Sequence, residues 1–457
     1  MPDLSAPSAI MFRVLVAATL LLPVAFEPAQ AQLRGHGGPV RALAISPDGA
    51  QAVSGSFDTS VIRWSLARNA AEQVLRFHDG AVNAAVFLRD GRIATSGEDA
   101  RIAIWRPGEA LPATVLAGHE APVVALAISP DGTTLASASW DHTARLWPLG
   151  AFSGKVDAGF PQKMRPTIES SGGAPRVIEG HSQNVNGVAF TPDGRALVTA
   201  GYDATLRITP LAGVAAPIVA TLPTPLNAVA VAADGEIVTA GANGKVYVLS
   251  ATGERRGEIE AAQTPIIALA LSGDGRRIAA ASIRGSVAVI DRATLRLERT
   301  LVGPGLPVWS AVFFPDNRTL LTGGTDRVIR RWDAVTGEPI GNVVMGAPED
   351  PLAAFAGDHG AEVFRACVAC HTLRADEGVR AGPTLAGIFG RRIATLPGYN
   401  FSDALKRLDI VWTPETVAKL FEVGPMTYTP GTKMPEQKIG SAEDRAALVE
   451  FLEKATK

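Results

Sequence analysis

Cysteine is almost absent from this chain. Of its 457 residues only Cys367 and Cys370 are cysteines, and two residues separate them. Neither can form a disulfide with a third cysteine, and no thiolates remain for a structural zinc site, which uses four ligands. Any chemistry that depends on cysteine must therefore occur within residues 367–370.

An excess of charge of either sign is also missing. Lys and Arg number 43 and Asp and Glu number 45, which gives a formal net charge of −2. A protein that binds nucleic acid needs a dense basic face to neutralise phosphates, and no part of the chain is basic enough to form one. Nucleic acid is therefore not expected as a partner.

The apolar segment near the N-terminus is short. Residues 14–26 form an apolar run of 13 residues, which is too short to span a bilayer comfortably. Arg13 precedes the run, and Ala29-Gln30-Ala31 provides a small-x-small cleavage site. Residues 1–31 are therefore predicted to be a secretory signal cleaved near Ala31, with Met11 as an alternative start. No stable membrane span is expected after cleavage; an uncleaved anchor is the alternative.

A repeat of about 40 residues extends over residues 32–346. Each unit has an apolar segment, an Asp-Gly or Asp-Asn turn, a segment rich in small residues, a second turn and a third segment. This period is typical of four-stranded propeller blades. The aspartate of the first turn occurs seven times, which predicts seven blades, at Asp48, Asp90, Asp131, Asp193, Asp234, Asp274 and Asp316.

Gly-His and Trp-Asp sequences in these units resemble the WD40 family over about two-thirds of the chain. The resemblance implies that a His, an Asp, a Ser or Thr and a Trp form a structural hydrogen-bonded cluster in each blade. Units five and six lack the histidine, and Asn243 and Gly285 stand near the position of their turn Asp. Four histidines are thereby assigned to repeat positions, which leaves no histidine cluster in the propeller for a haem or a copper centre: His36, His78, His119 and His181.

Two irregularities interrupt the repeat. The interval between Asp131 and Asp193 is 62 residues, so an insertion rich in Gly, Ser and Pro lies within residues 150–176. This surface insertion is either a disordered loop or a docking loop that uses Phe152, Phe160 and Met164. Few residues precede the first unit after cleavage. The ring is therefore expected to close with little or no exchange of strands between the termini, because residues 339–345 can supply the outer strand of blade seven.

Cys367-Val368-Ala369-Cys370-His371 is typical of a c-type haem attachment site. Two thiols at this spacing can each form a thioether with one porphyrin, and His371 can then bind the iron. A redox-active dithiol is the alternative interpretation. The sequence therefore predicts one covalently attached haem.

The last 101 residues, 357–457, resemble a class I cytochrome c, and residues 347–356 are expected to form a linker. The resemblance implies an all-α domain in which Gly360 and Phe364 pack against a C-terminal helix. It also implies that the carbonyl of Pro383 accepts the His371 N–H, which makes the histidine a better donor to the iron. In bacteria this family receives its haem outside the cytoplasmic membrane, which favours a periplasmic location.

The same resemblance assigns a second set of residues to the haem. Arg391, Tyr399 and Trp412 match positions that surround the propionates, whose buried charge needs donors. Met434 follows Pro430-Gly431-Thr432-Lys433 and matches the sixth ligand of the iron, with Met426 as the alternative. Coordination by His and Met occupies both axial positions of the haem iron. Such an iron carries electrons and has no open position for substrate.

These observations predict a multidomain protein in which an all-β, seven-bladed propeller precedes an all-α cytochrome c domain. The leading hypothesis is an exported carrier of single electrons, with the propeller as docking scaffold for a redox partner. One alternative is an oxidoreductase whose propeller binds a substrate or cofactor and whose haem accepts the electrons. Another is a binding or sensor module in which the redox state of the haem controls what the propeller binds.

Overall fold

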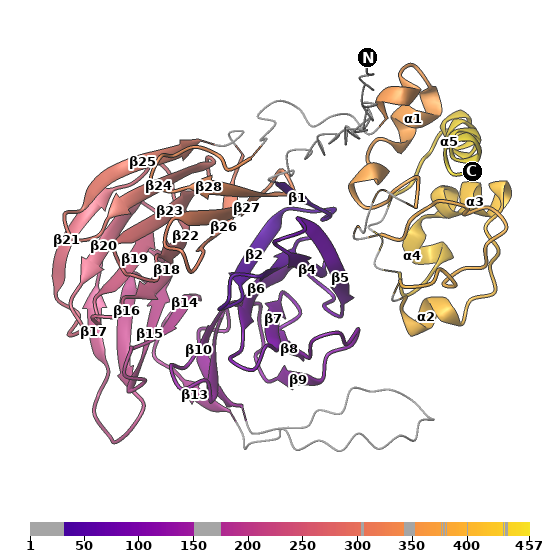
Figure 1. Cartoon of the computed structure of the whole chain (residues 1–457). Coiled ribbons are helices and arrows are strands. Elements are labelled where there is room, and N and C mark those ends of the chain that lie inside the picture. Colours follow the sequence, from indigo (N-terminus) through magenta and orange to yellow (C-terminus); the bar gives the residue numbers. More distant parts are fainter. Residues whose placement is uncertain are drawn as a thin grey trace, which may run out of the picture.

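The computed structural model describes residues 32–149, 175–302, 306–341 and 352–457 (Figure 1). Within the last range it does not describe the following positions: 376, 378, 379, 381, 400, 433, 435 and 436. The predicted signal, most of the insertion with Phe152, Phe160 and Met164, and residues 347–351 of the predicted linker lie outside the described residues.

The propeller consists of seven four-stranded antiparallel sheets, as the repeat predicts. Blade one consists of β2 (Val40–Ile45), β3 (Gln51–Ser56), β4 (Ser60–Ser65) and β5 (Ala70–Arg76). Blade two consists of β6 (Val82–Phe87), β7 (Ile93–Gly97), β8 (Arg101–Trp105) and β9 (Thr114–Ala117). Blade three consists of β10 (Val123–Ile128), β11 (Thr134–Ser139), β12 (Ala144–Pro148) and β13 (Arg176–Ile178). Blade four consists of β14 (Val185–Phe190), β15 (Ala196–Gly201), β16 (Thr205–Pro210) and β17 (Ile218–Thr221).

The remaining blades follow the same order. Blade five consists of β18 (Leu226–Val231), β19 (Ile237–Gly241), β20 (Lys245–Leu249) and β21 (Arg255–Glu260). Blade six consists of β22 (Ile266–Leu271), β23 (Arg277–Ser282), β24 (Ser286–Asp291) and β25 (Arg296–Val302). Blade seven consists of β26 (Val308–Phe313), β27 (Thr319–Gly324), β28 (Val328–Asp333) and, from the other end of the chain, β1 (Gln32–Arg34).

The closure of the ring differs from the expectation. The outer strand of blade seven is β1, in which Leu33 lies opposite Ile329 of β28. The prediction that residues 339–345 would supply this strand is wrong, since Pro339 makes only an isolated bridge to Trp332. Three residues are sufficient because Leu33 is 1% exposed and joins the core cluster between blades seven and one. The two ends of the propeller are therefore held together by a strand exchange.

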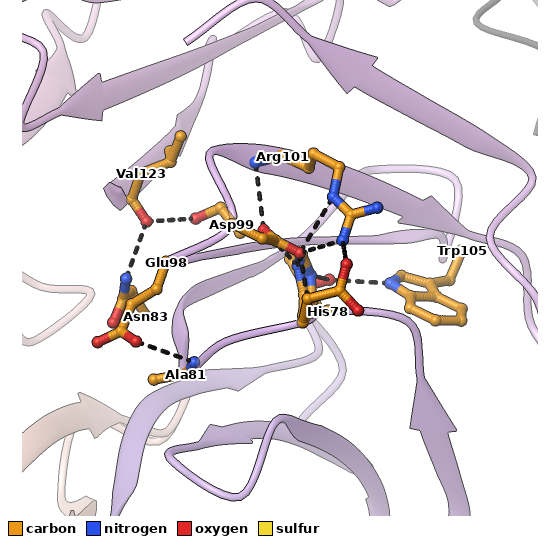
Figure 2. A network of polar contacts seen from close by, with 11 residues as sticks. His78, Ala81, Asn83, Glu98, Asp99, Arg101, Trp105 and Val123 are labelled. Atoms are coloured by element: carbon orange, nitrogen blue, oxygen red, sulfur yellow. Dashed lines mark hydrogen bonds and ion pairs between the residues drawn. The ribbon is translucent and has the colours of Figure 1, made fainter. Parts of the chain in front are cut away.

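Each of the first three blades contains the polar cluster that the WD40 resemblance implies. In blade two, Nδ1 of His78 bonds Asp99 over 3.1 Å, while Nε2 bonds Thr95 over 3.0 Å (Figure 2). The indole N–H of Trp105 donates to the same Thr95 hydroxyl over 2.9 Å. These side chains are buried and bonded to one another, so their role is structural. Blade five has a different arrangement, in which Asn243 bonds the hydroxyl of Tyr247.

The cytochrome domain is built from short helices. They are η1 (Ala353–Phe355), α1 (His359–Phe364), η2 (Cys367–Ala369), α2 (Asp403–Lys406), α3 (Pro414–Val423), α4 (Pro425–Tyr428) and α5 (Ala442–Ala455). Leu352 belongs to the core of this domain, and the ring of Phe355 packs against Phe451 of α5 at 5.0 Å. Part of the predicted linker therefore packs with the domain. Among the described residues, no helix combines the length and the apolar character needed to cross a membrane.

Candidate functional site: the haem attachment motif

Helix α1 positions the motif by packing tightly on α5. Asp358 caps α1 by accepting a hydrogen bond from the backbone N–H of Ala361 over 3.1 Å. At Gly360 an added Cβ would lie 2.6 Å from Cβ of Phe451, so only glycine allows the two helices to come this close. The ring of Phe364 lies 5.3 Å from that of Phe451. The predicted pairing of these two helices is thus present, and it fixes the direction in which the chain enters the motif.

The two cysteines and His371 lie in a single turn. Helix η2 begins at Cys367, and the carbonyl of Cys367 accepts the N–H groups of Cys370 and His371 over 3.0 and 2.9 Å. Both cysteines are free thiols and partly buried. Burial raises the pKa of each thiol to about 11, so both are neutral at physiological pH. This turn presents two protonated thiols next to one imidazole.

The imidazole of His371 is oriented by the loop that follows. Its Nδ1–H donates to the carbonyl oxygen of Pro383 over 2.7 Å, which is the hydrogen bond that the cytochrome resemblance predicts. Burial lowers the pKa of His371, which favours the neutral ring. Nε2 is therefore the nitrogen that can bind a metal, and the hydrogen bond at Nδ1 increases its basicity.

Met434 and Met426 differ in burial. Met434 is partly buried and packs against the domain core, whereas Met426 is 65% exposed. An iron ligand must face the interior where the porphyrin is held, so the structure favours Met434 over Met426 as the sixth ligand.

Two of the three residues predicted around the propionates, Arg391 and Trp412, lie side by side. Arg391 donates to the carbonyl oxygens of Thr384 and Ala386 over 2.9 and 3.2 Å, and its backbone oxygen accepts the N–H of Trp412 over 3.0 Å. Arg391 thus holds the loop after Pro383, and Trp412 packs on the core beside it. The ring of Tyr399 lies 4.6 Å from the ring of Phe401. Their contact with propionates stays a prediction.

Sequence reasoning did not identify Arg380. Its Nη1 donates to the carbonyl oxygen of Val368, inside the motif, and to that of His371 over 3.1 Å. These bonds hold the loop that carries Arg380 against the backbone carbonyl groups of the haem motif. No spacing rule marks an arginine at this position, and only the fold of the loop reveals its role.

Comparisons with known proteins match both parts of the chain. The model described as "WD domain, G-beta repeat" matches residues 28–65, 70–106, 111–148, 173–209 and 295–333, and the cytochrome c model matches residues 357–456. A cytochrome c of Cochliobolus lunatus is 42% identical over 99 residues, which are 21% of this chain and 91% of that protein. A cytochrome c of Arabidopsis thaliana is 42% identical over 99 residues, covering 21% of this chain and 88% of its own length. The cytochrome c type-1 of Ascaris suum is 38% identical over 113 residues, which are 24% of this chain and 96% of that protein.

The residues of the motif fit a covalently attached haem. Two free thiols are available for thioether bonds at Cys367 and Cys370. His371 offers Nε2 as the proximal donor, and an added Cβ at Gly382 would lie 2.5 Å from its Cε1, so glycine is needed beside the ring. Among the described residues, no group of His, Cys, Asp and Glu could form a separate metal site.

Proposed function

Because this chain belongs to the cytochrome c family through residues 357–456 and carries a covalently attached haem c, we propose that it is an exported electron carrier whose propeller docks a redox partner. The haem supplies transfer of single electrons. The protein contributes the two thioether cysteines and the two axial side chains, His371 and Met434. Export rests on the predicted signal in residues 1–31.

The observation that carries the proposal is the placement of both candidate axial ligands in one domain core. His371 is fixed by its hydrogen bond to Pro383, and Met434 and Cys367 both pack against the core cluster of the same domain. A protein that holds the iron from both sides leaves no coordination position for a substrate. Transfer of electrons at the haem edge is then the chemistry that remains.

Carbon monoxide binding tests this proposal. The reduced full-length protein is expected not to bind carbon monoxide, because Met434 occupies the iron. Met434→Ala is expected to bind it, while Met426→Ala, which changes an exposed side chain, is expected to behave like the unaltered protein. An unaltered protein that binds carbon monoxide readily would contradict the assignment of Met434.

A pocket at the mouth of the central channel favours a second candidate function. Its volume is about 270 Å³, and each blade contributes the second residue of its inner strand: Arg41, Asn83, Val124, Asn186, Asn227, Ile267 and Trp309. Arg41 bonds Asn83 over 2.9 Å, and its guanidinium lies 5.1 Å from the ring of Trp309. Exposed aromatic side chains of Trp140 and Tyr202 line the same mouth.

This pocket supports the alternative in which the propeller binds a small substrate and the haem accepts its electrons. The test is to screen planar organic acids as reductants of the oxidised protein, comparing the unaltered chain with Arg41→Gln. Reduction that depends on Arg41 would favour the enzyme. Equal reduction of both proteins would favour the electron carrier.

A further inference from the structure

The cytochrome domain lies against blades one and seven of the propeller (Figure 1). Arg76, at the end of β5, contacts it at two points. Its guanidinium carbon lies 4.3 Å from the centre of the Tyr399 ring, and its Nη2 lies 3.5 Å from the carbonyl oxygen of Arg380. Both partners flank the haem motif. The surface that faces the propeller is therefore the one where the haem is attached.

Gly37 marks the closest approach between the two domains. A Cβ added there would overlap Sγ of Cys370 and lie 3.5 Å from its Cβ. The backbone of Gly37 is not in the left-handed region, so blade one itself does not require glycine. The absence of a side chain at this position is explained by the space that Cys370 occupies.

The other blades show that the same repeat position normally carries a side chain. Gly37 follows His36, and its N–H donates to Asp58 over 2.6 Å. The residues that follow the equivalent histidines make the same bond to their own turn Asp, over 3.1, 3.2 and 2.9 Å, and they are Asp79, Glu120 and Ser182. A side chain is therefore compatible with the blade. Glycine is found in the blade that faces the cytochrome domain.

Arginines gather on the same side. Arg34 and Arg76 both stand two residues before a repeat histidine, where blades two and three have Ala117 and Glu179. Asp58 lies on the same side, with Oδ2 3.7 Å from the position of a Cβ at Gly37. Asp58 is paired with His36 at 3.1 Å. Arg76 is the propeller arginine whose contacts with the cytochrome domain are defined by distances.

We propose that Gly37 and Arg76 form an intramolecular docking surface for the haem edge attached at Cys370. A thioether at Sγ of Cys370 would bring that edge of the porphyrin next to Gly37, where the propeller would cover it. The guanidinium of Arg76 lies in a partly buried environment, where a charge is screened less than in water. Because this charge disfavours the more positive ferric haem, docking raises the reduction potential. The proposal does not depend on a redox partner in trans.

Gly37→Ser tests the docking surface, with Ser182→Gly as its matched control. Serine stands at the equivalent position of blade four, so Gly37→Ser is expected to leave the propeller folded and to push the domains apart. In the full-length haem protein we expect a lower reduction potential, a larger radius of gyration by small-angle scattering and a several-fold faster reduction by a neutral hydroquinone. Ser182→Gly is expected to change none of the three.

Arg76→Gln provides a second, independent variant. It removes the charge and the contact with Tyr399 but adds no bulk, so it remains informative if Gly37→Ser fails to fold. In Arg76→Gln we expect the reduction potential to fall and the domains to separate. Arg76→Lys keeps the positive charge, so its reduction potential is expected to fall less. Unchanged potential and scattering in folded Arg76→Gln would overturn the proposal, as would the same result in folded Gly37→Ser.

Discussion

Nδ1 of His371 donates a hydrogen bond to the carbonyl oxygen of Pro383, and the two atoms are 2.7 Å apart. This contact decides which imidazole nitrogen can face a metal, because the nitrogen that carries the proton cannot bind one. The carbonyl comes from the residue directly after Gly382, whose lack of a side chain leaves room for the ring. The orientation of the proximal donor therefore depends on backbone packing.

Gly382→Ala is expected to disturb this arrangement. The new Cβ would lie 2.5 Å from Cε1 and 2.7 Å from Nδ1 of His371, which forces the ring away from Pro383. We expect a smaller fraction of haem-loaded protein and a lower melting temperature of the cytochrome domain. Gly440→Ala is the control, because a Cβ there meets no atom within 4 Å. Equal haem content in both variants would contradict the packing argument.

Leu33→Ala tests the strand exchange that closes the ring. Leu33 is 1% exposed, and a buried leucine reduced to alanine costs about 2–5 kcal/mol of unfolding free energy. Urea unfolding followed by tryptophan fluorescence measures the loss. Leu297→Ala on outer strand β25, where the side chain is 50% exposed, is expected to lose less than about 1 kcal/mol. Similar losses in the two variants would show that β1 does not hold the ring.

Thr95→Val tests the polar cluster of blade two. The change keeps the shape of the side chain but removes the hydroxyl that bonds both His78 and Trp105. Each buried group left without its partner costs about 1–3 kcal/mol. We expect a lower urea midpoint with an unchanged haem spectrum, since the cluster is structural. Thr221→Val at an exposed position is the control. If Thr95→Val lost redox activity while its stability stayed normal, the cluster would have a role other than the structural one.

Acid is expected to destabilise the propeller in two steps. Burial lowers the pKa of His119 and His181 below the ordinary 6.5, so the unfolded chain takes up protons first and stability falls below about pH 6.5. For Asp58, burial opposes ionisation, but the charge and hydrogen bond of His36 and a bond from Ser60 outweigh it and lower its pKa from 3.8 to about 2. The stabilisation that ionised Asp58 gives to the folded propeller is lost as the pH falls from about 4 towards 2. Urea midpoints that rise on acidification would contradict both assignments.

The sequence predicts the repeated and the local features well. Seven turn aspartates give the seven blades, and the five residues from Cys367 to His371 define the haem site, because these depend on short, fixed spacings. The exchange of β1 was missed because three residues show no periodicity and their partner strand lies almost 300 residues later in the chain. Gly37 and Arg76 were missed for a related reason. Their roles depend on how one domain lies against the other, which no local pattern encodes. Arg380 was missed because its bonds to Val368 and His371 depend on how the loop after the motif folds back.

The spin state and near-infrared absorption of the oxidised full-length protein test the central claim most directly. Coordination by His371 and Met434 predicts a low-spin ferric haem with a sulfur-to-iron charge-transfer band, and it predicts that Met434→Ala loses this band. A high-spin ferric haem without the band in the unaltered protein would mean that the iron has an open position. The chain would then be better described as a catalyst than as an electron carrier.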